Sequence, residues 1–131
     1  MTTIFDKSFN DKLLEQAAGN PRLRQNYDLR NSAKDTSQRI MNALLPGTQV
    51  PIHRHENSAE TVICLSGRLE EIIYQEEKGA EGTSTFKEVC RTLLCPAEGQ
   101  YGMQVPMGAW HSIEVHEPSI IFEAKDGAYM G

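Results

Sequence analysis

The stretch PGTQVPIHRHENSAETVICLSG, residues 46–67, decides the fold and carries the chemistry. His53 and His55 are separated by one residue. On an extended backbone alternate side chains lie on the same face, so both imidazoles point one way and Arg54 points away. Glu60 follows a segment with turn character that can bring its carboxylate back beside the two histidines. The stretch therefore predicts an extended segment that presents two imidazoles and one carboxylate to a common point.

Short segments rich in β-branched and aromatic residues surround this stretch, with turn-forming residues between them. Many short strands without a second helix predict an all-β sandwich or small barrel. The polar, glycine-containing segment Gln75–Thr85 is expected to be an exposed hairpin loop. The expected strands are Arg39–Leu45, Thr61–Leu65, Arg68–Tyr74, Phe86–Leu94, Tyr101–Val105, Trp110–Val115 and Ile120–Lys125.

An N-terminal arm precedes the strands. A helical pattern covers Ser8–Gly19, where Ser8 and Asp11 resemble a capping box and Gly19 followed by Pro21 is a stop signal. Residues 22–30 alternate with period two and are expected to form an extended arm or an edge strand. Because the helix is short, it must pack on something to be stable.

The length of 131 residues suits one domain over 1–131, with the arm over about 1–36 and the barrel over about 37–131. Thirteen Lys and Arg against 18 Asp and Glu give a net charge of −5, which argues against a protein that binds nucleic-acid phosphates. No apolar run approaches the length of a membrane span, and the first residues lack the features of a secretory signal. These observations predict a soluble, cytoplasmic protein that acts on neither nucleic acid nor membrane.

Three cysteines, Cys64, Cys90 and Cys95, are an odd number and have no zinc-type spacing. They are expected to be small, buried, reduced thiols, although a disulfide between Cys90 and Cys95 stays open. If the strand after Glu60 runs without a bulge, Val62 and Cys64 share its inward face. Cys64 is therefore expected to pack in the core.

A third histidine, His111, lies far along the chain in the segment Pro106–His111. Taken alone, each histidine is well explained as a surface or hydrogen-bonded core residue. Together, three imidazoles and one carboxylate suit a borderline divalent transition metal such as iron, manganese, nickel, cobalt or zinc. Strand parity places His111, Ile113 and Val115 inside and leaves Ser112, Glu114 and His116 outside, so His116 is a poor ligand candidate.

The sequence resembles the cupin superfamily. The pattern Gly47-x5-His53-x-His55-x4-Glu60-x6-Gly67 matches the first cupin motif, and the segment Pro106–His111 matches the centre of the second. The wider sequence, including residues 20–22 and 39–43, looks like the WbuC-type cupin metalloproteins, a family associated with surface-polysaccharide gene clusters. The second motif departs from the pattern in two places. Six residues instead of five separate Gly99 from Pro106, and Val115 stands where an Asn is common.

The resemblance implies a double-stranded β-helix, the cupin jelly roll, with one divalent metal ion held by His53, His55, Glu60 and His111. It also implies an enzyme acting on a small polar metabolite, such as a sugar or nucleotide-sugar intermediate of surface-polysaccharide synthesis. Isomerisation, epimerisation and oxygenation are the reactions considered. The alternative is a non-catalytic cupin that binds or senses a small ligand or metal.

Further side chains are candidates for a substrate pocket around the metal: Arg39, Tyr101, Gln104 and Glu123. A homodimer is also expected, because the helical arm with Arg22-Leu23-Arg24 offers an element that could cross to a second copy.

Overall fold

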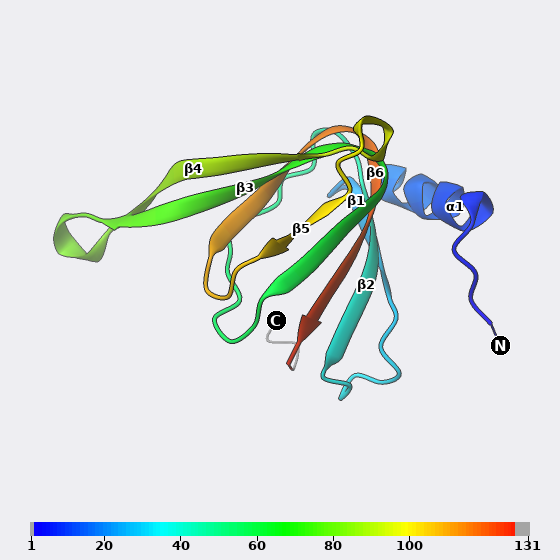
Figure 1. The fold of residues 1–131 in the computed structure, drawn as a ribbon, viewed down its shortest axis with the longest axis horizontal. Helices are drawn as coiled ribbons and strands as arrows, with labels where there is room; N and C mark the ends of the chain where they lie inside the picture. Colours follow the sequence, from blue (N-terminus) through cyan, green and yellow to red (C-terminus); the bar gives the residue numbers. More distant parts are fainter. Residues whose placement is uncertain (1, 128–131) are drawn as a thin grey trace.

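Two long antiparallel strands, β3 (Glu60–Lys78) and β6 (Trp110–Asp126), run through the fold and carry the other strands on their edges. The computed structural model describes residues 2–127, and Figure 1 shows both strands curving through the molecule. The antiparallel sheet has the order β1-β2-β6-β3-β4, with β5 also paired to β3, and it does not close. The other elements are α1 (Lys7–Ala18), β1 (Arg24–Asp28), β2 (Ser37–Leu44), β4 (Ser84–Leu94), β5 (Gly102–Val105), and the single-turn helices η1 (Ala80–Gly82) and η2 (Pro96–Glu98). The predicted all-β class with one short N-terminal helix is confirmed.

A corner in both long strands divides the sheet into two halves. Residues 60–64 of β3 pair with 121–125 of β6, residues 69–74 pair with 110–115, and the register shifts between these stretches. The sequence predicts a break between two strands at each of these points. Instead, each long strand continues through the corner, so four predicted strands are two continuous ones.

Gly67 makes this corner possible. Its φ is +99°, and a β-carbon there would lie 2.3 Å from the Ser119 hydroxyl oxygen and 2.4 Å from the Pro118 carbonyl oxygen. The backbone N–H of Arg68 donates a hydrogen bond to Ser119 Oγ (3.0 Å), which joins the two strands beside the bend. A glycine is required here both for its left-handed backbone and for the space it leaves.

Two apolar clusters hold the halves and the helix in place. The first fills the interior between the strands, and the second lies under α1, where Leu13 and Ala17 are buried. The expected inward positions Val62 and Cys64 both belong to the first cluster, which confirms the parity derived from Glu60. The first cluster comprises Leu44, Val62, Cys64, Leu69, Leu94, Val105, Val115 and Ile121.

The N-terminal arm packs on its own sheet. Strand β1 lies at the sheet edge and pairs with β2, which confirms the predicted edge strand, and α1 packs against β1 and β2. The predicted cap is wrong: the side chain of Asp6 accepts the hydrogen bond from the Phe9 amide (2.9 Å), whereas Ser8 is already helical. Gly19 ends the helix as expected. The arm therefore contacts the sheet of its own chain.

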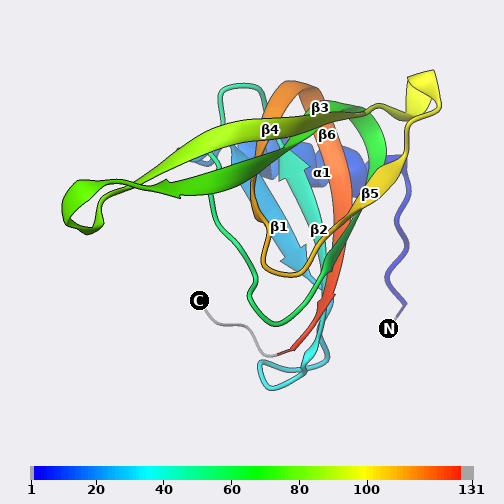
Figure 2. The same cartoon turned by 60° about the vertical axis from the view of Figure 1, so that its left-hand side comes forward.

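The β3–β4 hairpin projects from the body of the molecule, as Figures 1 and 2 show from two sides. The segment Gln75–Thr85 is not simply a loop, because β3 continues to Lys78 and β4 begins at Ser84, with η1 between them. All three cysteines are free. Cys64 and Cys95 are buried as expected, but Cys90 lies exposed on β4, which corrects the expectation for that residue. Of the helices within residues 2–127, none has the length and apolarity of a membrane span.

Replacing Gly67 tests the corner. Gly67→Ala should lower the free energy of unfolding by about 3 kcal/mol, because the new β-carbon collides with the backbone of β6 and strains φ. Urea denaturation measures the loss. Gly82→Ala is the matched control: its φ is +75°, but nothing lies within 4 Å of a β-carbon there. It should cost only about 1 kcal/mol of backbone strain. Equal losses in the two variants would contradict the role given to the corner.

Candidate metal centre

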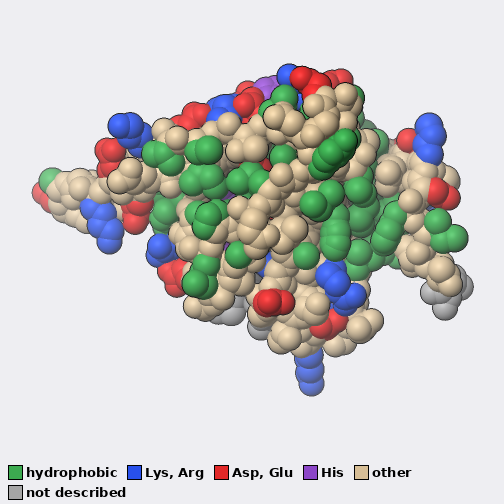
Figure 3. Space-filling view, viewed as in Figure 1, with side chains coloured by type: hydrophobic (Ala, Val, Ile, Leu, Met, Phe, Trp, Pro, Cys, Tyr) green, Lys and Arg blue, Asp and Glu red, His purple; other side chains and the backbone are tan. Residues whose placement is uncertain are grey.

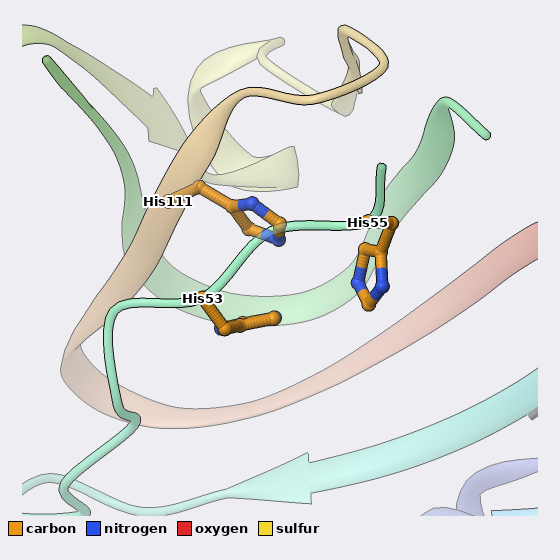
Figure 4. A group of neighbouring side chains, drawn as sticks. All are labelled: His53, His55 and His111. Atoms are coloured by element: carbon orange, nitrogen blue, oxygen red, sulfur yellow. The ribbon is translucent and has the colours of Figure 1, made fainter. Parts of the chain in front are cut away.

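Three histidines from two distant segments converge on one point (Figure 4). His53 and His55 lie in the segment between β2 and β3, and His111 is the second residue of β6. The backbones of His53 and His111 pair directly, with N–H to O=C distances of 3.0 Å and 2.8 Å in the two directions. The ring centroids are 4.2 to 5.5 Å apart, and one possible ligand atom of each residue lies within 4.8 Å of the others.

Backbone carbonyls fix which nitrogen of two of these rings is free. His53 Nδ1 contacts the Pro51 carbonyl oxygen at 2.8 Å, and His111 Nδ1 contacts the Ala109 carbonyl oxygen at 3.0 Å. A carbonyl oxygen can only accept, so each Nδ1 carries the hydrogen and each Nε2 keeps its lone pair. His111 Nε2 is buried and has no hydrogen-bond partner among the described residues. An oriented but unpartnered imidazole nitrogen is what a metal ligand requires.

Burial also keeps these imidazoles neutral. His111 is only 2% exposed, and burial lowers the pKa of both His53 and His111, despite the opposing backbone hydrogen bonds. Neutral imidazole is the form that binds a metal ion.

Glu60 is the first residue of β3 and lies buried beside the histidines. Its Oε2 is 2.9 Å from His55 Nε2 and 3.9 Å from Lys125 Nζ, and Lys125 Nζ is 3.3 Å from the same His55 nitrogen. Burial raises the pKa of Glu60, but the hydrogen bonds with His55 and Glu123 and the nearby positive charges outweigh it and lower the pKa to about 2. Glu60 is therefore ionised at neutral pH and contacts the His55 imidazole, although its carboxylate is not among the ligand atoms that all lie within 4.8 Å of one another.

A cavity of about 510 Å³ opens beside these four residues, and two further glutamates line it. Burial, followed by the charge of Glu60 and the hydrogen bond shared with it, raises the pKa of Glu123 well above its usual value. Asn42 Nδ2 donates to Glu123 Oε1 at 3.2 Å. Burial and the charge of Glu60 also raise the pKa of Glu71, to about 8. Glu60 is thus the readily ionised acid of the cavity, whereas Glu71 and Glu123 keep their protons to a higher pH than usual.

The predicted substrate-pocket residues do not all lie in this cavity. Glu123 lines it, but Arg39 and Gln104 line a separate hollow on the outside of the sheet, and Tyr101 is 59% exposed. Gln104 lies opposite Thr61 in the β3–β5 pair, and its side-chain oxygen accepts a hydrogen bond from the Thr61 hydroxyl at 2.6 Å. Thr61 is the residue after Glu60, so Thr61 and Gln104 are on the other face of the sheet from Glu60. The sequence shows neither this pairing nor its register.

Sequence reasoning missed Glu71, Asn42 and Arg24, which line the cavity. A signal for Glu71 exists. Glu71 lies two residues from Leu69 and two from Ile73, both of which contribute to the core. Residues two apart on a strand share a face, so the side chain of Glu71 also points inward.

The outward parity of β6 is confirmed in part. His116 and Glu114 are exposed, and His116 Nε2 lies 2.6 Å from Glu70 Oε1 on the outer face, where Arg91 pairs with both glutamates. Ser112 is the exception. It is buried, and its hydroxyl donates to the Val50 carbonyl oxygen at 2.7 Å, because the segment before His53 covers this face of β6.

The donor set fits a divalent transition metal. His53, His55 and His111 offer imidazole nitrogens, Glu60 offers an ionised carboxylate, and the unpartnered His111 Nε2 faces the shared point. His55 and Glu60 contact each other through the same atoms that would face a cation, so a bound ion would replace their mutual hydrogen bond.

Comparisons with known proteins agree with this fold. The model of the family described as "Domain of unknown function (DUF6016)" matches residues 5–86. No curated protein matches the sequence significantly. Among solved structures, KdgF from Halomonas sp. is similar at 15% identity and a TM-score of 0.57, with 84% of each chain covered.

Two further structures are similar, and one of them is described as a cupin. An RmlC-like cupin protein from Desulfovibrio desulfuricans is similar at 10% identity and a TM-score of 0.50, over 81% of this chain and 84% of that chain. Bacillus subtilis oxalate decarboxylase, in a structure described by its Mn(II) centres, is similar at 18% identity and a TM-score of 0.55. That match covers 82% of this chain and 26% of the decarboxylase. These similarities show a cupin fold, so the jelly roll implied by the sequence motifs is confirmed.

The buried Glu71 predicts a pH dependence of stability in the metal-free protein. Its pKa is about 8 in the folded chain against an ordinary 4.5, so between these values the folded state binds more protons than the unfolded state. The free energy of unfolding should therefore fall as pH rises from 5 to 8, by up to about 1.4 kcal/mol per pH unit. Glu71→Gln should remove this slope, so its stability relative to the wild type should increase with pH.

Urea denaturation at several pH values, with chelator present, measures the difference. Glu77→Gln, at an exposed position of the same strand, is the control and should keep a constant difference from the wild type over this interval. A Glu71→Gln difference that is equally constant would show that Glu71 ionises in the folded protein as freely as in the unfolded one.

Proposed function

The chain belongs to the family described as "Domain of unknown function (DUF6016)", and from the geometry of its histidine cavity we propose that it is a metal-dependent cupin enzyme acting on a small polar metabolite. One observation carries the proposal: the rings of His53 and His111 are locked by backbone carbonyls with Nε2 free, beside His55 and an ionised Glu60. The nitrogen ligands of such a site are preorganised for binding a cation.

The four proposed ligands are His53, His55, Glu60 and His111, and the cofactor is one divalent ion of iron, manganese, nickel, cobalt or zinc. When bound, such an ion supplies Lewis-acid chemistry that polarises a carbonyl or lowers the pKa of a hydroxyl or water. The cavity beside the ligands has the volume for a small metabolite, and the side chains of Arg24 and Arg54 line it. This charge favours a ligand with anionic groups.

The finer parts of the proposal rest on the resemblance to WbuC-type cupins. They comprise a sugar or nucleotide-sugar substrate of surface-polysaccharide synthesis, and isomerisation, epimerisation or oxygenation as the reaction. A cytoplasmic location and a homodimer also belong to the proposal. Apolar side chains gather on the face shown in Figure 3. The exposed large apolar residues of the chain include Ile63, Leu65 and Tyr101.

Removing a ligand tests the metal site. His53→Ala and His111→Ala should each lose bound metal while the fold persists, with affinity reduced at least a hundredfold, since even outer partners of metal ligands contribute about 10–100-fold. Elemental analysis of protein purified without chelator measures the occupancy. Glu77→Gln is the control, because Glu77 is exposed on β3 and belongs to neither group of possible metal ligands, and it should keep the wild-type metal content. Full metal occupancy in both variants would show that His53 and His111 are not metal ligands.

The coordination of the loaded ion separates an enzyme from a binding module. Four protein ligands leave one or two positions free on a five- or six-coordinate ion, and an enzyme needs such a position next to the cavity. Water-proton relaxation of the manganese-loaded protein should therefore show an exchangeable water. A closed site without one would favour the non-catalytic cupin that binds or senses a metal.

A further inference from the structure

We propose that Glu71 and Asn42 form a hydrogen-bonding subsite inside the histidine cavity that holds the hydroxyl group of a small hydroxycarboxylate ligand. The inference rests on the proposed function, since the same cavity binds the metal and the ligand. It names the chemical class of that ligand from polar groups that the metal site itself does not use.

Glu71 is a carboxyl group without a partner. Its side chain is 1% exposed, it lines the cavity, and neither of its oxygens has a hydrogen-bond partner among the described residues. Burying an unpartnered polar group is unfavourable, and such groups in folded proteins call for a specific explanation. Burial, followed by the charge of Glu60, raises its pKa to about 8 in the metal-free protein, and in its protonated form it has one O–H to donate and oxygens that accept.

Asn42 supplies a second unpartnered atom from the opposite half of the sheet. Its Nδ2 donates to Glu123 Oε1, and this leaves Oδ1 buried without a partner among the described residues. Asn42, Glu71 and Glu123 all line the same cavity. A ligand hydroxyl can accept a hydrogen bond from Glu71 and donate one to Asn42 Oδ1, which satisfies both groups.

The cations of the cavity favour a carboxylate on the same ligand. Arg24 is half-buried, and its Nη1 donates to the Gln49 carbonyl oxygen at 2.7 Å. Within residues 2–127, no carboxylate lies within ion-pair distance of Arg24. Arg54, in contrast, pairs with Glu56 and stacks over Trp110 at 4.6 Å. Arg24 is therefore the lining cation that a ligand carboxylate can neutralise, since Arg24 forms no ion pair among these residues.

Glycolate and acetate test the inference, since they differ by one hydroxyl group. Isothermal titration of the manganese-loaded protein should show that glycolate binds more tightly than acetate. The ratio of the two affinities should fall about tenfold in Glu71→Leu and in Asn42→Ala, because each loses one hydrogen bond to the hydroxyl. Acetate affinity should stay near the wild-type value in both variants. Glu71→Gln, which keeps a donor and an acceptor, should retain most of the preference.

Glu77→Gln is the control, at an exposed position of β3 outside both groups of possible metal ligands, and it should leave the ratio unchanged. Manganese itself prefers glycolate, so only the change of the ratio between proteins reports the subsite. A ratio that is the same in the wild type, Glu71→Leu and Asn42→Ala would overturn the inference, as would a loaded wild type that binds no glycolate at millimolar concentration. Elemental analysis of the same samples reports metal binding separately, so failure of the proposed function is distinguishable from failure of the subsite.

Discussion

The backbone pairing of His53 with His111 is the constraint on which the site depends. Two backbone hydrogen bonds between these residues join the irregular segment after β2 to the start of β6. Each ring is then oriented by a carbonyl two residues before it in the chain, from Pro51 and from Ala109. The main chain thus sets the orientation of the His53 and His111 rings. The conformational entropy of these side chains is therefore lost when the protein folds and not when a metal ion binds.

The cavity concentrates acid groups where charge is costly. Glu60, Glu71 and Glu123 line one cavity, and burial together with the charge of Glu60 raises the pKa values of Glu71 and Glu123, whereas the pKa of Glu60 itself is lowered to about 2. Ionised Glu60 is balanced in part by Lys125 and by the hydrogen bond with His55. A divalent cation would balance it more fully, since the local charge of the ion exceeds that of any side chain present. The arrangement is therefore less favourable for stability alone than an apolar core of equal volume would be.

Much of the fold was predictable because its signals are local or periodic. The spacing of His53, His55 and Glu60 placed three side chains on one side, and parity from Glu60 placed Val62 and Cys64 in the core. The cap predicted at Ser8 was wrong, because Asp6 lies just before the helix with an extended backbone and its side chain accepts the hydrogen bond from the Phe9 amide. Gln104 was misplaced because its orientation depends on pairing with Thr61, a register between strands that no single segment carries.

Glu71 shows why a site is harder to predict than a fold. Its position between Leu69 and Ile73 is a core position by periodicity, and an acidic residue there contradicts the pattern of its own strand. Such a conflict between local pattern and residue type lowers stability and carries no benefit for packing. Conflicts of this kind in natural proteins concentrate at functional sites. Glu71, which interrupts the apolar periodicity of β3, is therefore the residue whose type and position in the sequence point to the proposed hydroxyl-binding subsite.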